Sequence, residues 1–332
     1  MSSSTSSFSD EWKVLAAVAL VLLAGEGLLR YAGPRVSSDI RQIRSLPRRA
    51  EKLHAGSGAR VLLLGNSLAR SGLQKDLFVA ETRRLGAPAF AMGVENFNGA
   101  EITEWHRMLE ENYASPSRRP DVVIVSAAGA TSFADKPDVR LGRLAHLTSA
   151  RRAPVVLADD LEGFGDRAEY AQSLLFFSFA SRSGIQDKAL ERVIPYYDEC
   201  TRRVKLAGRD RARARQAASG SGPKRTYRRL RRFLRTARHS GITPVLVLMP
   251  YAKDYEVPAE LFRAAADGAA RVLDCRRIDG LTPRHYSDGH HLNADGAGVF
   301  SREFAARLVR QHPDVLLGAS TGPRTGPGAD EG

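Results

Sequence analysis

The chain has 332 residues, of which 43% are hydrophobic and 26% are charged, a balance that suits an ordinary globular core. This composition excludes collagen-like and wholly disordered proteins. Disulfide-scaffold proteins are excluded because two cysteines in so long a chain cannot form a disulfide framework. The sequence leaves open whether Cys200 and Cys275 pair. The formal charge of +13 indicates anionic surroundings, such as phospholipid headgroups, an acidic polymer or nucleic acid.

The N-terminal region combines a polar tail with an apolar run. Residues 1–12 are rich in serine, and we expect them to be disordered. Residues 14–29 are apolar except for Glu26. A transmembrane helix usually takes about 20 residues, yet we interpret residues 13–31 as a membrane anchor with Tyr31 at the interface. We expect Glu26 to reach the headgroups from near one end. The alternatives are a soluble core helix and a cleaved signal peptide, although the preceding segment lacks net positive charge.

Basic residues are unevenly distributed around this run. Lys13 and the amino terminus precede it, whereas six arginines follow it, namely Arg30, Arg35, Arg41, Arg44, Arg48 and Arg49. By the positive-inside rule, this asymmetry places the following domain in the cytoplasm. Residues 32–59 are predicted to form a basic linker between the anchor and that domain.

Short apolar runs then alternate with segments of helical periodicity. Three runs predict strands buried on both faces, and two others are weaker candidates: 60–64, 122–125 and 245–248, then 155–157 and 271–273. Helices are expected over 102–111, 223–239 and 298–311. This alternation predicts an α/β domain, a three-layer α/β/α sandwich with a mostly parallel sheet, over residues 60–312. Ligands bind such sheets at the carboxyl ends of the strands. Residues 313–332 are expected to form a disordered tail.

A serine follows the first apolar run. Gly65-Asn66-Ser67 stands at the predicted carboxyl edge of the sheet, where a nucleophile can be exposed with a helix N-terminus behind it. A turn that only caps the next helix is the alternative interpretation.

A histidine-rich loop precedes the last expected helix. Asp288 and His291 are three residues apart, so in a turn the carboxylate can reach one ring nitrogen while the other nitrogen faces a site. His285 and His290 are rivals for the same role, and the spacing favours His291. The alternative is a polar loop that only caps the last helix.

Together the two motifs resemble the SGNH, or GDSL-like, hydrolase superfamily over roughly residues 60–312. Gly65-Asn66-Ser67 stands where that family has its Gly-Asp-Ser block, and Asp288-Gly-His-His291-Leu292-Asn293 matches its Asp-x-x-His-Leu block. Phe90-Ala-Met-Gly93-Val94 resembles the second block, whose glycine amide helps to bind the oxyanion. The anchor is similar to those of membrane-anchored bacterial members, including alginate O-acetyltransferase-like proteins and the lipoteichoic-acid D-alanylation protein.

The sequence departs from the family pattern at two points. Asn66 replaces the usual aspartate beside the nucleophile. The third block should supply Gly-x-Asn-Asp after the second predicted strand, but no asparagine follows Val125 there. Losing an oxyanion donor typically costs about 10²–10³ in rate. Asn98 is a candidate substitute that also fits a simple turn before a glycine. Further candidates are Ser126 and Thr131.

The resemblance implies a serine esterase or O-acyltransferase that needs no cofactor, expected to handle acetyl groups on a carbohydrate or other cell-surface polymer. Ser67 would attack the ester carbonyl, His291 would move the proton and Asp288 would hold the imidazole. Backbone N–H groups of Ser67 and Gly93, with Asn98, would bind the oxyanion. The sequence contains no metal-ligand spacing and no nucleotide-binding fingerprint.

Two other functions remain open. One is a catalytically weak relative that serves as a scaffold or binding component of a membrane polysaccharide-assembly complex. The other is a basic membrane-surface adaptor without a site. A membrane acyl-donor protein is a further expected partner of the acyltransferase. Family members act outside the cytoplasm, so we expect an extracytoplasmic domain, against the arginine count.

A basic helical insert is expected at about 165–240. Between residues 201 and 239 the chain has 15 lysines and arginines and one aspartate. Leu230, Phe233 and Leu234 recur at helical spacing and should pack inward. The charges either face solvent or contact anionic lipid or acidic polysaccharide, and nucleic acid is disfavoured because aromatic residues do not interleave with them. The apolar residues 174–179 either pack in a core, roof the site or touch the bilayer.

Overall fold

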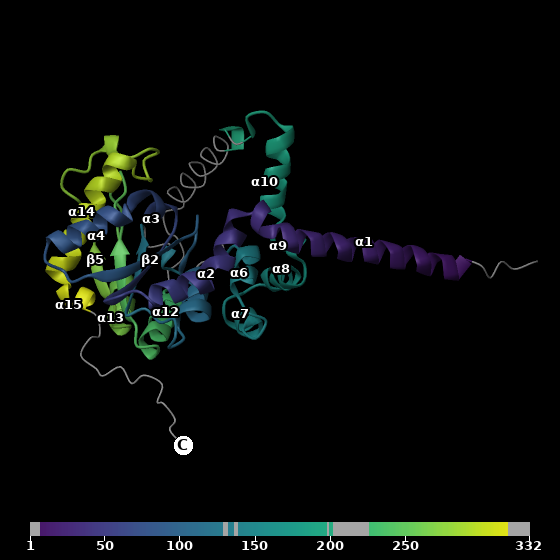
Figure 1. Ribbon diagram of the computed structural model, residues 1–332, viewed down its shortest axis with the longest axis horizontal. Coiled ribbons are helices and arrows are strands. Elements are labelled where there is room, and N and C mark those ends of the chain that lie inside the picture. Colours follow the sequence, from purple (N-terminus) through teal and green to yellow (C-terminus); the bar gives the residue numbers. More distant parts are fainter. Residues whose placement is uncertain (1–6, 129–131, 136–138, 198, 202–225, 318–332) are drawn as a thin grey trace, which may run out of the picture. The chain divides into compact units, whose positions relative to one another are not determined.

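A computed structural model describes residues 7–128, 132–135, 139–197, 199–201 and 226–317 (Figure 1). Two compact units are present. We call residues 1–45 with 140–224 the helical unit, and residues 46–139 with 225–332 the sheet unit. Residues 1–6 and 318–332 of the predicted tails, the basic segment 202–225 and the candidate Thr131 lie outside the described residues. Residues 7–12, which were expected to be disordered, form the first turns of helix α1 (Ser7–Val36).

The sheet unit is built on five parallel strands in the order β2-β1-β3-β4-β5. The strands are β1 (Ala59–Gly65), β2 (Phe90–Asn96), β3 (Val122–Ala127), β4 (Thr243–Leu248) and β5 (Arg271–Asp274). Every residue of β1 and β3 is buried, as expected for strands covered on both faces. The predicted three-layer α/β sandwich with a parallel sheet is thus confirmed.

Helices cover both faces of this sheet. They are α3 (Ser67–Gly72), α4 (Lys75–Arg84), α5 (Ile102–Met108), α12 (Arg228–His239), α13 (Ala259–Asp267), α14 (Ala294–Gln311) and α15 (Pro313–Leu317), with a π-helical turn over Leu109–Tyr113 after α5. Phe78 of α4 and Phe300 and Phe304 of α14 share one core with alternate β1 residues such as Val61. The intervening residue Leu62 is equally buried, so the opposite face is covered too.

Two local predictions were wrong, and one strand was not predicted. Residues 155–157 belong to α7 (Ala153–Asp159), because a three-residue apolar run is too short to separate strand from helix. Strand β2 was not predicted, because its apolar residues Phe90–Val94 include Ala91 and Gly93, which are depleted in strands. Residues 313–317 form α15 instead of a tail, because Val315 and Leu316 are buried in the sheet-unit core.

The helical unit contains α1 (Ser7–Val36), α6 (Leu141–Leu147), α7, α8 (Phe164–Leu175), α9 (Phe177–Ala180) and α10 (Arg182–Val193). Over the predicted linker, residues 32–59, for which a helical and an irregular form were both open, the chain forms the end of α1 and then α2 (Ser38–His54). Residues of α2 from Leu46 onward belong to the sheet unit. Asp39 of α2 accepts two hydrogen bonds from Arg143 of α6, at 2.8 and 3.0 Å. The basic helix α12, predicted as part of the insert, belongs to the sheet unit.

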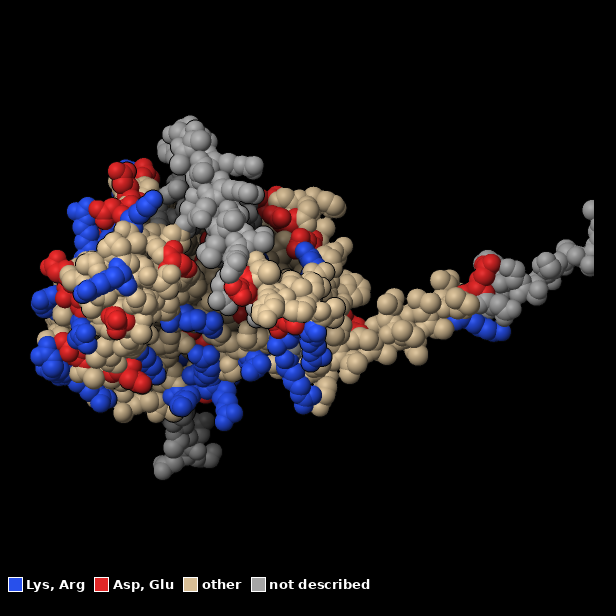
Figure 2. All heavy atoms as spheres, turned by 90° about the horizontal axis from the view of Figure 1, so that it is seen from above, with Lys and Arg blue, Asp and Glu red and all other residues tan. Residues whose placement is uncertain are grey.

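Helix α1 holds the membrane-anchor candidate. Its segment Glu11–Arg35 is long and apolar enough to cross a membrane. All side chains of residues 11–25 are exposed, and Figure 2 shows α1 without charge over most of this length. A soluble core helix would bury such a surface, so the exposure favours an anchor.

Candidate active site

Ser67 is the first residue of α3, directly beyond the carboxyl end of β1. Asn66 is the N-cap of that helix, and its Oδ1 accepts the N–H of Leu68 at 3.0 Å. The asparagine that replaces the family's aspartate therefore performs the capping that a short polar side chain performs at this position. Gly65 is required sterically, because a Cβ there would lie 2.3 Å from the Cβ of Ala69.

The backbone carbonyl of Gly65 accepts two hydrogen bonds from the segment that follows β2. It accepts the indole N–H of Trp105 at 3.1 Å and the backbone N–H of Phe97 at 3.3 Å. Trp105 and Phe97 are both fully buried, so these bonds lie in a region closed to water. The end of β1, the turn after β2 and the start of α5 are thereby held together.

The histidine loop is a tight hairpin before α14. Tyr286 and Leu292 form a β-bridge, and the N–H of Ser287 donates to the carbonyl of His291 at 2.8 Å. Gly289 at the tip has φ +75°, a conformation that favours glycine. Asn293 caps α14 by accepting the N–H of Gly296 at 3.0 Å. The alternative role of this loop as a helix cap is therefore also present.

The structure brings Ser67, His291 and Asp288 together. The Nε2 of His291 lies 2.9 Å from the Oγ of Ser67, and its Nδ1 lies 2.7 Å from the Oδ2 of Asp288. The side chains of His291 and Asp288 are 22% and 28% exposed. A serine, an imidazole and a carboxylate in this order can perform nucleophilic acyl transfer.

The carboxyl of Asp288 is held in its charged form. Partial burial favours the neutral acid, but three hydrogen bonds outweigh it and lower the pKa of Asp288 below its ordinary 3.8. They come from the backbone N–H and the ring of His291 and from the backbone N–H of His290. Asp288 is therefore ionised at neutral pH and can stabilise a positive imidazolium.

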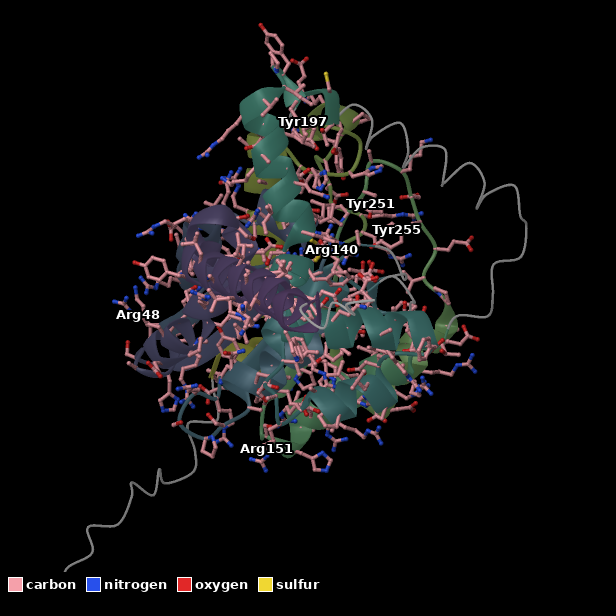
Figure 3. The ribbon with its side chains drawn as sticks, turned by 90° about the vertical axis from the view of Figure 1, so that its right-hand side faces the viewer. Arg48, Arg140, Arg151, Tyr197, Tyr251 and Tyr255 are labelled. Atoms are coloured by element: carbon pink, nitrogen blue, oxygen red, sulfur yellow. The ribbon has the colours of Figure 1, made fainter. Side chains whose placement is uncertain are left out.

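The two rival histidines have other partners. His285 is buried, and its Nδ1 accepts the N–H of Thr282 at 3.0 Å within a 3₁₀ turn. The ring of His290 packs on Tyr251 with 5.3 Å between centroids. Tyr251 in turn packs on Tyr255, and Figure 3 shows the two tyrosines close together.

Gly93 does not lie beside Ser67. It pairs with Leu62 in mid-strand, three residues before the pair Gly65 and Asn96 that ends both strands. At about 3.3 Å per residue, this places it about 10 Å upstream of the strand end. This position does not fit the predicted oxyanion role of Gly93 beside Ser67, because the run that contains it is a strand extending to Asn96.

The turn after β2 lies against the end of β1, because the N–H of Phe97 donates to the carbonyl of Gly65. Phe97 and Ala100 close it through a 3.0 Å backbone hydrogen bond, and Gly99 within it has φ +66° and is exposed. Asn98 is also exposed, and its Oδ1 accepts the guanidinium of Arg70 from α3 at 3.4 Å. Gly99 and Arg70 were not predicted as site residues, although an Asn-Gly pair marks a turn in the sequence.

The carboxyl end of β3 lies on the other side of β1. Ser126 pairs there with Gly65 and is 1% exposed. Ser126 is followed by Ala127 and Ala128, so neither of the next two side chains can act as the missing oxyanion donor. The further candidate Thr131 falls outside the described residues.

No group of three or more His, Cys, Asp and Glu side chains within the described ranges could hold a metal ion. Both cysteines are free: Cys200 is exposed and Cys275 is buried. Burial raises the pKa of the Cys275 thiol to about 12, so this group is inert at neutral pH.

No family model and no curated protein matches the chain. Solved structures similar to it include a lipase/acylhydrolase from Enterococcus faecalis, at 12% identity and a TM-score of 0.37, over 76% of this chain and 96% of that one. An acetylxylan esterase from Geobacillus stearothermophilus matches at 10% identity and a TM-score of 0.35, over 77% and 96% of the two chains. These likenesses are too distant to indicate a function. A proposal for the function therefore depends on the geometry of Ser67, His291 and Asp288.

Proposed function

We propose that this chain is a serine ester hydrolase or O-acyltransferase of SGNH type that works through an acyl-serine intermediate. The observation that carries the proposal is the ring of His291, whose two nitrogens join Ser67 at 2.9 Å and Asp288 at 2.7 Å. Ser67 lies 224 residues from His291 in the chain, so their meeting at one sheet edge is a property of the fold.

The first half of the reaction acylates the serine. The Oγ of Ser67 attacks the ester carbonyl while the Nε2 of His291 takes its proton, and Asp288 stabilises the resulting imidazolium. The tetrahedral intermediate then collapses, the bond to the leaving alcohol breaks, and His291 returns the proton to that alcohol. In the second half, water or an acceptor hydroxyl attacks the acyl-serine by the same proton route.

The oxyanion needs donors near the carboxyl end of β2. We assign this role to the backbone N–H groups of Ser67 and Gly99, with Gly99 taking the part expected of Gly93. The amide of Asn98 is the side-chain donor we propose in place of the missing third-block asparagine. The guanidinium of Arg70 donates to the Oδ1 of Asn98 at 3.4 Å, which links this side chain to the helix that begins at Ser67.

The substrate we propose is an acylated carbohydrate or other cell-surface polymer, with acetyl as the acyl group. The partial exposure of both His291 and Asp288 suits a chain-like substrate that cannot enter a closed pocket. The exposed apolar α1 supports a single-pass membrane anchor, and we propose that the enzyme acts outside the cytoplasm. A membrane acyl-donor protein would supply the acyl group if the reaction is transfer.

A scaffold or binding component of a polysaccharide-assembly complex is the second candidate. The observation that favours it is the carboxyl end of β3, where Ser126 and two alanines stand in the region of the family's third-block asparagine. A weak or absent oxyanion site would lower the rate of acyl transfer without preventing binding.

The test uses the full chain in detergent, a fluorescent serine-directed phosphonate and an aryl acetate. Ser71 offers a matched control, because it lies in the same helix and its hydroxyl donates only to the carbonyl of Leu68. Ser67→Ala should abolish phosphonate labelling and ester hydrolysis, whereas Ser71→Ala should retain both. Labelling that survives in Ser67→Ala, or is absent from folded wild-type protein, would favour the scaffold.

A further inference from the structure

Helix α1 consists of an exposed part and a docked part. Burial begins at Glu26 and continues at Leu29, Ala32 and Gly33, which share one helical face. This face packs on α9. A Cβ at Gly33 would lie 2.4 Å from the ring of Phe177, so α1 and α9 approach as closely as glycine allows.

Polar contacts also join α1 to α9. The carboxylate of Glu26 accepts the backbone N–H of Phe177, and also that of Ser178 at 3.1 Å. It accepts the Nε of Arg30 at 3.0 Å as well, and Arg30 donates a second hydrogen bond to the carbonyl of Leu175 at 2.5 Å. We call these contacts the Glu26 clasp. The side chain of Glu26 is 13% exposed, so it does not extend toward headgroups as the sequence suggested.

The Glu26 clasp positions two neighbouring apolar residues, Leu175 and Phe176, which we call the corner. Leu175 ends α8 and Phe176 precedes α9, and their side chains are 66% and 50% exposed. The backbone next to them is bonded to Glu26 and Arg30, so the corner lies level with the last turns of the apolar stretch. That is where α1 would leave a bilayer.

The length of the apolar stretch supports a lipid contact at this level. Residues 14–29 rise about 24 Å as a helix, which is shorter than a hydrocarbon core of about 30 Å. Such mismatch draws flanking side chains into the interface. Tyr31, with Arg35 above its ring at 5.6 Å, is an amphipathic pair typical of that zone, and the arginine complements anionic headgroups.

We propose that the corner formed by Leu175 and Phe176 is a second membrane contact, inserted at the boundary between headgroups and acyl chains beside the end of α1. The lipid bilayer is its partner, and the Glu26 clasp holds the corner at that depth. The proposal rests on the proposed membrane anchor, and it is independent of the catalytic role of Ser67.

Site-specific fluorescence in vesicles tests this proposal with the full chain. Single cysteines for an environment-sensitive fluorophore replace Phe176, Leu20 in the exposed part of α1, and Phe262 in α13 of the sheet unit. Phe262 is a matched control, because it is a partly exposed phenylalanine outside the helical unit. The background carries Cys200→Ser, since Cys275 is buried. Vesicles of phosphatidylcholine and phosphatidylglycerol carry nitroxide quenchers about 5–10 Å below the headgroups.

The labels at positions 20 and 176 should lose most of their fluorescence, and the label at 262 should keep it. Adding Glu26→Ala should restore fluorescence at 176 but not at 20, because the corner is released while α1 stays inserted. A label at 176 quenched no more than that at 262 overturns the proposal. An unquenched label at position 20 would show that α1 is not inserted in the bilayer, which overturns the membrane anchor and the proposal that rests on it. Quenching at 176 that survives Glu26→Ala overturns the role of the clasp.

Discussion

The sheet unit and the helical unit differ in the contacts that join their distant segments. In the sheet unit, β1 and β3 are wholly buried, and aromatic side chains such as Phe304 fill the core beneath them. In the helical unit, polar contacts join segments more than 100 residues apart, from Glu26 to Phe177 and from Asp39 to Arg143. Apolar packing therefore supports Ser67 and the histidine loop, whereas a few polar contacts help to position α1 on α9. Each unit should therefore respond to its own mutations.

The largest effect is expected at the triad. Asp288→Asn keeps the shape of the side chain but removes the charge that stabilises the imidazolium, and it should lower kcat for aryl acetate hydrolysis about 10⁴-fold. The stability of both units should stay close to that of wild type. His290→Gln is the control, because the His290 ring packs on Tyr251 and not on Ser67. An equal loss of activity in His290→Gln and His291→Gln would contradict the assignment of the base.

A core mutation should unfold the sheet unit selectively. Phe304 is fully buried and packs on Phe78 at 4.7 Å between ring centroids. Phe304→Ala should lower the free energy of unfolding by about 3–5 kcal/mol, because it creates a cavity. Urea titration followed by phosphonate labelling of Ser67 measures the sheet unit, and hydrogen exchange of α9 measures the helical unit. Equal destabilisation of both units would show that they fold as one, against the comparison.

A matched pair of glycines in α1 tests the helical unit. Gly33→Ala would drive a methyl group into the ring of Phe177, whereas a methyl group at Gly25 meets nothing within 4 Å. We expect Gly33→Ala to destabilise the packing of α1 on α9 by about 1–3 kcal/mol. Hydrogen exchange of the Phe177 and Ser178 amides reports the loss, and Gly25→Ala should leave it unchanged. Faster exchange in both variants would mean that the close approach at Gly33 is not the cause.

The smallest effect is a pH dependence of the helical unit. Burial of the imidazole, with the positive charges of Arg44 and Arg30, lowers the pKa of His146 below its ordinary 6.5. The unfolded chain therefore binds a proton before the folded one does, and the unit loses stability as pH falls from about 6.5 toward the folded pKa. The protection factors of the α9 amides, which are corrected for the intrinsic pH dependence of exchange, should fall over this range, and His146→Gln should flatten the response. An unchanged response in that variant would point to another group.

The sequence predicted the parts of the site that depend on local pattern. The wholly apolar run of β1 and the glycine after it indicated where Ser67 would emerge, and the three-residue spacing of Asp288 and His291 indicated a turn. Both predictions depend on local sequence pattern. An uninterrupted apolar run indicates a buried strand, and a three-residue spacing lets two side chains meet within one turn. Gly93 was expected beside Ser67 because β2, an edge strand with mixed burial, was not predicted as a strand, so its end at Asn96 was not located.

The helical unit was much less predictable. In the sequence, Glu26 is a charge that interrupts an apolar run. Only the fold shows that two backbone N–H groups, 151 and 152 residues away, donate hydrogen bonds to its carboxylate. Residues 174–179 left three interpretations open for the same reason. Polar contacts over such distances leave no periodic pattern, so neither amphipathicity nor spacing reveals them.

The central claim is that Ser67 carries the acyl group, and trapping the acyl-enzyme tests it most directly. The full chain is mixed with an aryl acetate, quenched in acid within the first turnover, digested and examined by mass spectrometry. We predict one added acetyl group on the peptide that contains Ser67, and its absence from Ser67→Ala. Folded wild-type protein that hydrolyses the ester without an acetyl group on this peptide, or that acetylates another residue, would contradict the account.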